Sequence, residues 1–378
     1  MIAVWDPTSR SVRFYRQPAL AFGASASVVA FNWVACALCS CLLVLLEVAA
    51  SNFYDDYTVV EFAPLAADTA QVTEAFFELL GWDLKELPAF SAAPEPLGCV
   101  VDLSKCREGT CIIKNRASRV ADITGAISEL LEKGAAEPIV MRKLRGRLVH
   151  ARAQTFGRFG GMALRALALV ADRPSGRREL PDECVRALSL FSDFLKHGPP
   201  RQIRALHVDA PLLFTDGACE ESGSNGRLVV GVGAVLFLAS PRRVLWLGCN
   251  VPDALVDTWQ SEGSKQVIAQ GELLPILMAR RLWADHLRGR SIMTFVDNDA
   301  ARAAMIRGYS ANRHSAAVVD QVARQDIFEG TLVWYERVPS QSNPADAPSR
   351  GEVPEVIKGW PPPVRAEVPG SVYKGLAG

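Results

Sequence analysis

Several patterns that would assign a function directly are missing from this sequence. Its 378 residues carry no formal net charge, so the overall charge does not indicate a nucleic-acid partner. Nine cysteines are scattered along the chain, and the C-x-x-C pair Cys36 and Cys39 has no second pair at the spacing of a zinc finger. We therefore expect the cysteines to be small core residues in a reducing compartment, inside the cell, either in the nucleus or in the cytoplasm.

Charged residues are missing from a long run, Pro18 to Leu46. The second half of this run resembles a membrane helix, for which about 20 apolar residues suffice, and a single-span membrane protein built on residues 28–50 is one alternative. The basic stretch that opens a signal peptide is missing as well. Several small or polar residues interrupt the run: Gly23, Ser25, Ser27, Asn32 and Ser40. We expect a buried helix here and no membrane partner.

Apolar side chains are abundant and the charges are unevenly distributed. With 49% hydrophobic and 22% charged residues, the chain can bury a sizeable core, and its length predicts two or three domains. Between Ser51 and Lys105 ten acids face two lysines, whereas between Met141 and Glu179 ten basic residues face two acids. Such asymmetry can mark a metal site beside a phosphate-binding track.

The basic stretch falls on a predicted helix from Glu137 to Leu169. Basic side chains along a helix would grip the backbone of a nucleic-acid duplex, although a solvated helix face gives the same pattern. The candidates for nucleic-acid binding are Arg142, Lys143, Arg145, Arg147, Arg152 and Arg158.

Four acids stand at the ends of predicted strands and helices. Residues 213–218, Leu-Phe-Thr-Asp-Gly-Ala, read as an apolar strand that ends in a carboxylate and a glycine-assisted turn. The other three acids are Glu272 at the start of an apolar helix, Asp297 at the end of a strand, and Asp346 at the start of a further helix. Because hard cations bind carboxylate oxygens, we expect Asp216, Glu272, Asp297 and Asp346 to hold Mg²⁺ or Mn²⁺.

The order and residues of these motifs resemble the ribonuclease H domain of retroelement reverse transcriptases. That family has T-D-G/A on the first strand, a glutamate on the first helix, an aspartate ending the fourth strand and a final N-x-x-A-D-x-x-S-R segment. Here residues 342–350 read Ser-Asn-Pro-Ala-Asp-Ala-Pro-Ser-Arg. The resemblance implies an α/β fold of the α+β type, with a mixed five-stranded sheet and flanking helices, and the four acids as catalytic metal ligands.

The reaction that this resemblance implies is hydrolysis of the RNA strand of an RNA–DNA hybrid. One Mg²⁺ would activate water and the other would stabilise the leaving 3′ oxygen, while selectivity for RNA would rest on contacts with the 2′-hydroxyl. Many relatives carry a histidine just before the last acid. Residues 336–339 occupy that position here without one, which bears on turnover more than on fold.

Each acid also has a simpler interpretation. Asp216 would suit a turn at a strand end, and Glu272 would be favoured by the dipole at a helix start. Asp297 would cap the next helix, a role that Asp299 fills better. For Asp346 a capping role is compatible with metal binding, since Asn343 as N-cap places it near the third helical position.

A second resemblance lies upstream, to the palm of reverse transcriptases. Residues 19–27 are similar to the L-P-F-G segment, with Ala21 in place of the usual proline, and residues 54–57, Tyr-Asp-Asp-Tyr, are similar to the Y-x-D-D hairpin. Asp55 and Asp56 are the candidate catalytic acids, although Asp-Asp also suits an ordinary turn. The earlier palm acid that two-metal chemistry needs is missing, so we expect an incomplete polymerase, for which a partner would supply the remaining palm and fingers.

Together the motifs predict four segments. These are a truncated reverse transcriptase palm at 1–95, a helical thumb or connection region at 96–200, a ribonuclease H-like domain at 208–350 and an extended tail at 351–378. The Tyr-Asp-Asp-Tyr and Asn-Pro-Ala-Asp segments most resemble DIRS-like elements. The expected function is hybrid cleavage by a retroelement-derived fragment, and the alternatives are an inactive nucleic-acid-binding remnant and the membrane protein described above.

Overall fold

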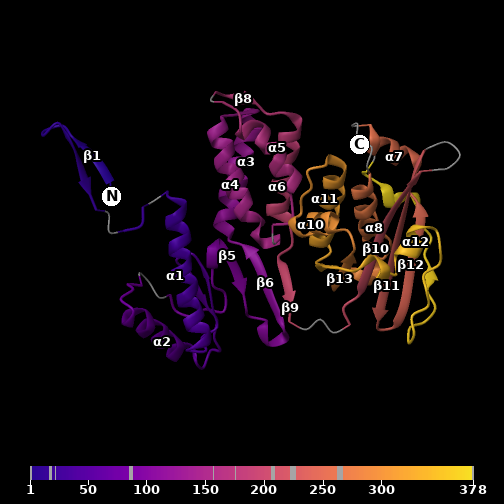
Figure 1. Cartoon of the computed structure of the whole chain (residues 1–378), viewed down its shortest axis with the longest axis horizontal. Coiled ribbons are helices and arrows are strands. Elements are labelled where there is room, and N and C mark those ends of the chain that lie inside the picture. The colour runs from indigo at the N-terminus through magenta and orange to yellow at the C-terminus, as the bar shows by residue number, and fades with distance from the viewer. Residues whose placement is uncertain are drawn as a thin grey trace. The chain divides into compact units, whose positions relative to one another are not determined.

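The computed structural model contains two compact units, residues 1–96 and 97–378, and each is described by itself (Figure 1). The described residues are 2–16, 19–21, 23–84, 88–155, 157–174, 176–205, 209–221, 227–261 and 267–376. Residue 208, where the ribonuclease H-like segment was expected to begin, and Phe22 of the palm-like segment lie outside them. The four predicted segment boundaries stay predictions.

The first unit contains two hairpins and two helices among its described residues, and the second hairpin is the one expected around residues 54–57. Asp6 accepts hydrogen bonds from the Thr8 amide and the Ser9 hydroxyl, which closes the first hairpin. Leu38, Leu42, Val48 and Phe77 form a small core between the helices and the second hairpin. The elements are β1 (Ile2–Asp6), β2 (Ser11–Tyr15), α1 (Ser25–Val44), β3 (Ala50–Phe53), β4 (Asp56–Val59) and α2 (Ala66–Leu79).

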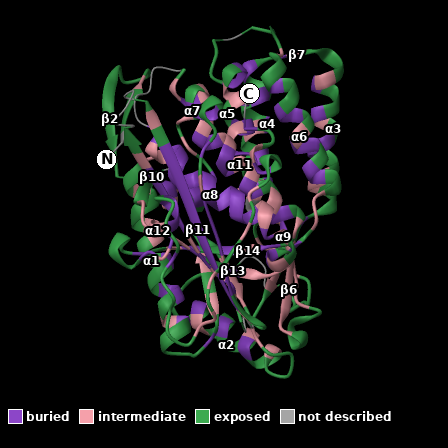
Figure 2. Cartoon of the chain, turned by 90° about the vertical axis from the view of Figure 1, so that its right-hand side faces the viewer, coloured by how far each residue is buried: buried purple, intermediate pink, exposed green. Residues whose placement is uncertain are grey.

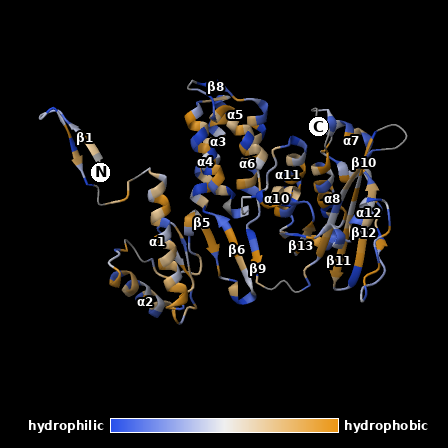
Figure 3. Ribbon diagram, viewed as in Figure 1, coloured by the Kyte–Doolittle hydropathy of each residue, from blue (hydrophilic) through white to orange (hydrophobic). Residues whose placement is uncertain are grey.

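Helix α1 is covered on one narrow face, so the prediction of a buried helix is wrong for most of its surface. Trp33 is 77% exposed, and hydrophobic residues lie along the helix (Figure 3). By length and composition α1 could cross a membrane, since it has 20 residues and a mean hydropathy of 2.1. The buried residues of α1 are Ala35, Leu38, Cys39 and Leu42. Sequence periodicity could not show this, because the apolar residues surround the helix evenly.

The second unit begins with a small antiparallel sheet and a group of helices. The predicted helix from Glu137 to Leu169 is interrupted: α4 ends at Ala151 and α5 starts at Gly161. Gly157 and Gly160 adopt positive φ between them, a conformation that suits glycine and ends a helix. The elements are β5 (Cys99–Asp102), β6 (Thr110–Asn115), α3 (Ala117–Lys133), β7 (Ala135–Ala136), α4 (Pro138–Ala151), α5 (Gly161–Ala171), β8 (Arg178–Glu179), α6 (Asp182–His197) and β9 (Arg201–Arg204).

A mixed sheet with flanking helices forms the rest of this unit. Its strand order is β14-β13-β10-β11-β12-β15, with β10, β11 and β12 antiparallel and β10, β13 and β14 parallel. The predicted α/β architecture is confirmed and is consistent with a ribonuclease H-like fold. The strands are β10 (Leu212–Glu221), β11 (Leu228–Ala239), β12 (Arg242–Asn250), β13 (Ser291–Val296), β14 (Leu332–Arg337) and β15 (Val364–Arg365). Five strands were expected, and the two-residue β15 adds a sixth.

The two faces of this sheet are covered differently. Along β11 Val232, Ala234 and Leu236 face the main core, which includes α8 and α11, whereas Val235 and Phe237 face a smaller cluster with Ala345. This alternation is the period-two pattern of a strand buried on both sides (Figure 2). The helices are α7 (Asp253–Gln260), α8 (Ile268–Leu282), α9 (Ala284–Leu287), α10 (Asp299–Arg307), α11 (Arg313–Phe328) and α12 (Asp346–Ser349).

The residues after 350, expected to form an extended tail, pack against this unit. Trp360 contacts Phe237 edge to face, at 5.1 Å between ring centroids. Val364 and Arg365 pair with β12, and Val372 is buried in the main core. The segment is therefore part of the structure that supports the sheet.

Candidate metal centre

The register of two parallel strands brings Asp216 and Asp297 to the same place. The last paired residues of β10 and β13 are Thr215 and Val296. Asp216 and Asp297 are the next residue on each strand, where β13 ends and β10 continues. Two acids 81 positions apart thus become neighbours, because each follows an apolar strand by one residue.

Glu272 reaches the same place from helix α8. Gly217 of β10 lies directly against α8, so that a β-carbon on Gly217 would be 2.6 Å from the Glu272 amide nitrogen. Hydrogen bonding to the Gly217 amide and to the Asn298 side chain lowers the pKa of the Glu272 carboxyl, against a larger opposite effect of burial. Because Gly217 has no side chain, α8 can lie close enough to β10 to place Glu272 beside the strand.

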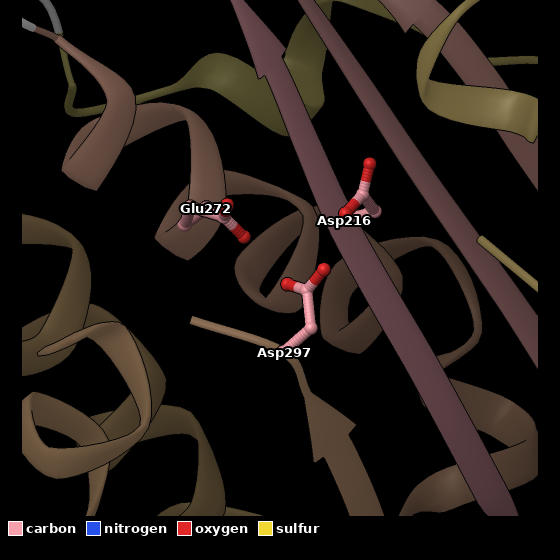
Figure 4. Close-up of side chains that lie close together, drawn as sticks. All are labelled: Asp216, Glu272 and Asp297. Atoms are coloured by element: carbon pink, nitrogen blue, oxygen red, sulfur yellow. The ribbon is translucent and has the colours of Figure 1, made fainter. Parts of the chain in front are cut away.

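The three acids form a group that fits a divalent cation. One carboxylate oxygen from each of Asp216, Glu272 and Asp297 lies within 4.8 Å of the other two, and the three side chains converge (Figure 4). Asp216 is 4% exposed and Glu272 is 6% exposed. Glu272 Oε2 and Asp297 Oδ1 are buried and have no hydrogen-bond partner among the described residues. A divalent cation such as Mg²⁺ or Mn²⁺, bound by these buried carboxylate oxygens, would supply the partner that they lack.

The pKa values of two of these acids are strongly perturbed. Burial, followed by the nearby charges of Asp297 and Asp216, raises the pKa of Glu272 to about 9. Burial also raises the pKa of Asp216 to about 6, with Asp297 and Asp346 adding to the rise and a hydrogen bond from Ser349 opposing it. Like charges crowded in a buried site favour the protonated form, and a bound cation would reverse this effect.

Asp346, the fourth predicted ligand, lies beside this group and outside it. Its carboxylate pairs with Arg350 at 3.4 Å, and its side chain is 45% exposed. Asp346 is the first residue of α12, so that helix begins later than expected. Asn343 accepts a hydrogen bond from the Ala345 amide, within the turn that precedes α12. The structure thus brings together three of the four acids, and metal binding by Asp346 stays a prediction.

Asp55 and Asp56 lie in the first unit, in the expected hairpin. Asp55 is a turn residue, and Asp56 begins β4, where it pairs with Phe53. Both are exposed, and within the described part of the chain neither belongs to a group of acids close enough to hold a metal ion. Their catalytic role in a polymerase stays a prediction.

Most of the predicted nucleic-acid-binding residues make contacts inside the protein. Arg142 donates to the Ala171 carbonyl at 2.9 Å, and Arg145 lies 3.6 Å from Asp172. Arg152 donates to the Gly157 carbonyl, and Arg158 donates to the Val333 carbonyl at 2.9 Å.

Arg158 also lies over the ring of Tyr335, 5.5 Å from its centroid, so it joins the helical region to β14. Lys143 and Arg147 are exposed on α4, and no ion pair or hydrogen bond engages them within the part of the chain that the structure describes. These two remain the best placed of the six for a backbone phosphate.

Two further residues belong to the site and were not predicted as part of it. The Ser349 hydroxyl donates to Asp216 Oδ2, and the Asn343 amide group lies 3.5 Å from Asp216 Oδ1. Both are in the Asn-Pro-Ala-Asp-Ala-Pro-Ser-Arg segment, which the sequence singled out for its acid. The spacing of Ser349, three residues after Asp346 on one helical turn, was the available signal.

Comparisons with known proteins give a likeness to solved structures alone. The sequence matches no protein-family model and no curated protein. Among solved structures 63 chains match. One of them is the foamy viral protease-reverse transcriptase in complex with dsDNA, at 10% sequence identity and a TM-score of 0.36. The alignment covers 84% of this chain and 59% of that chain, so this chain spans little more than half of its length.

Proposed function

We propose that residues 97–378 form a metal-dependent nuclease of the ribonuclease H type, which hydrolyses the RNA strand of an RNA–DNA hybrid. The observation that carries the proposal is the convergence of Asp216, Glu272 and Asp297 from two strands and a helix, within 4.8 Å of one another. The fold and the order of these acids along the chain are those that the sequence resemblance implies.

The chemistry follows from what these side chains can hold. A pair of Mg²⁺ ions, when bound, supplies an activated water and a charge that stabilises the leaving 3′ oxygen. Asp216, Glu272 and Asp297 would hold the ions, with Asp346, whose charge contributes to the raised pKa of Asp216, as the proposed fourth ligand. The fixed strand register and the Gly217 contact keep the three carboxylates together before any cation binds, so the protein has little reorganisation to make.

The experiment that tests this function uses the full chain and a labelled RNA–DNA hybrid. With Mg²⁺ we expect short RNA products from the hybrid. Double-stranded DNA of the same sequence should not be cleaved. Chelation with EDTA and the substitution Asp216→Asn should each abolish cleavage. Asp285→Asn is the matched control, because Asp285 is an exposed acid on α9 outside the acidic group, and it should cleave as wild type does.

The outcomes separate the alternatives. Cleavage that persists in Asp216→Asn would contradict the proposal, because the described residues contain no second group of acids that could hold the metal ion in its place. Hybrid binding without any cleavage by the wild-type chain would instead support an inactive nucleic-acid-binding remnant.

A further inference from the structure

The segment from Asn343 to Ser349 holds the carboxylate of Asp216 from the side opposite α8. Ser349 donates its hydroxyl to one oxygen of Asp216, and Asn343 lies 3.5 Å from the other. Asn343 also donates to the Thr215 carbonyl at 3.1 Å. Ser349 is 3% exposed and Asn343 is 6% exposed, so water does not compete freely for these contacts.

Little else fixes this carboxylate from the sheet itself. On β11 the residue paired with Asp216 is Gly233, which has no side chain. On the other side, the ladder between β10 and β13 has ended at Thr215. Gly233 therefore leaves Asp216 without a side-chain neighbour on β11. The side chains that contact its carboxylate are Asp297, just past the end of β13, and Ser349 and Asn343 of this segment.

Glycines fix the position of that segment. A β-carbon on Gly231 would lie 1.9 Å from the Ser349 carbonyl oxygen. A β-carbon on Gly233 would lie 2.5 Å from the Ser349 amide nitrogen. A β-carbon on Gly248 of β12 would lie 2.5 Å from the Pro348 carbonyl oxygen. We call Gly231, Gly233 and Gly248 the glycine surface. Because α12 rests on it backbone to backbone, Ser349 reaches Asp216 with a one-carbon side chain.

We propose that Ser349 is a positioning residue for the metal centre, which orients the carboxylate of Asp216 toward the cation through its hydroxyl, with Asn343 as a weaker second donor. A carboxylate oxygen has two lone pairs, so Asp216 can accept from Ser349 and still bind a cation. Groups that hydrogen-bond to a metal ligand fix its orientation, and their loss typically costs about 10- to 100-fold in metal affinity. This inference rests on the proposed metal centre and extends it by one residue that binds no metal itself.

The test measures metal binding and not cleavage. Mn²⁺ is titrated into the metal-free full chain, and free Mn²⁺ is followed by electron paramagnetic resonance. We expect Ser349→Ala to weaken Mn²⁺ binding by about 10-fold or more. Ser349→Thr keeps the hydroxyl and should bind within about threefold of wild type, a rescue that a packing role alone would not give. Ser340→Ala is the matched control: Ser340 is exposed three residues before this segment, and loss of its hydroxyl should change nothing.

Three results would overturn the proposal. The first is wild-type Mn²⁺ affinity in Ser349→Ala, and the second is an equal loss in the alanine and threonine variants, which would show that packing and not the hydroxyl matters. The third is a wild-type chain that binds no Mn²⁺. A wild-type chain that binds Mn²⁺ and does not cleave the hybrid would remove the proposed function and leave this inference standing, so the two failures are distinguishable.

Discussion

Gly217 and Gly271 lie backbone against backbone, where strand β10 meets helix α8. A β-carbon on Gly217 would be 2.5 Å from the Gly271 carbonyl carbon, a distance that real side chains do not tolerate. The contact fixes how closely α8, and Glu272 with it, approaches the two aspartates.

Gly217→Ala should therefore damage the fold and the metal centre together. The added methyl would push α8 outward, and overpacking of this kind costs about 1–3 kcal/mol. We expect a lower free energy of unfolding in urea and weaker Mn²⁺ binding. Gly125→Ala is the control: Gly125 is exposed in α3 with no atom within 4 Å of an added β-carbon, so it should stabilise the protein by about 0.5–1 kcal/mol. Undiminished Mn²⁺ affinity in Gly217→Ala would contradict this account.

The metal-free protein should lose stability as pH rises. The folded-state pKa of Glu272 is raised from 4.5 to about 9, so folding favours its protonated form. That contribution is fully present below pH 4.5 and disappears as pH rises through about 9, by linkage. Asp216, with its pKa raised to about 6, adds to the fall at the acidic end of this range.

Thermal unfolding in EDTA between pH 5 and pH 9 checks this expectation. The melting temperature of the wild-type chain should fall across the range. The corresponding loss in the free energy of unfolding is on the order of a few kcal/mol. Glu272→Gln cannot ionise and should flatten most of the slope. Saturating Mg²⁺ should also flatten it, because the cation replaces the proton as the partner of the carboxylates. Parallel slopes for Glu272→Gln and wild type would show that other groups cause the pH dependence.

Asp346 should behave differently from the three acids that meet. Its partner is Arg350 and it is partly exposed, so Asp346→Asn should change stability by less than about 0.5 kcal/mol. We expect Mn²⁺ affinity at the acidic group to stay within about threefold of wild type, whereas Asp297→Asn should lower it by about 10-fold or more. If Asp346 completes a second ion site during the reaction, Asp346→Asn should still reduce hybrid cleavage. Equal losses of Mn²⁺ affinity in both variants would place Asp346 among the primary ligands.

The predicted nucleic-acid-binding residues should separate into two groups. Lys143 and Arg147 are exposed, and replacing both with alanine should weaken duplex binding and lower the slope of log affinity against log salt by about 2. Arg158 is engaged with Val333 and Tyr335, so Arg158→Ala should lower stability by about 1–3 kcal/mol, because it leaves a carbonyl without its partner. Fluorescence anisotropy over a salt series, together with urea unfolding, measures both. An unchanged salt slope in the double variant would exclude α4 as a phosphate-binding track.

The acidic group was largely predictable from sequence, because its members follow recognisable local patterns. Asp216 and Asp297 each end an apolar stretch, and Glu272 follows a glycine at the start of an apolar helix. The parallel register of β10 and β13 then brings the two aspartates together. The contact between Ser349 and Asp216 spans 133 positions and depends on glycines in two other strands, so the spacing of Ser349 from Asp346 was only an indirect sign of it.

Other features were misjudged because the burial of a residue depends on which other elements pack against it, and the local sequence does not show this. An evenly apolar helix such as α1 gives no sign of which face is covered, and only four of its residues are buried. The long basic helix was expected to be continuous, yet α4 ends at Ala151 and the left-handed glycines at 157 and 160 lie in the connection to α5. Those glycines are visible in the sequence and would have marked the break if their left-handed conformation had been anticipated.

The glycine surface beneath α12 gives this protein a point of vulnerability remote from its carboxylates. Gly233→Ala would leave all four acids in the chain, and any search for the acidic signature would still recognise it. The methyl group would nevertheless lie where the Ser349 amide and the Ala345 carbonyl now are, at 2.5 Å from each. A sequence can therefore keep the four acids and lose their arrangement, and the three glycines indicate whether the acids of a related sequence are still held together.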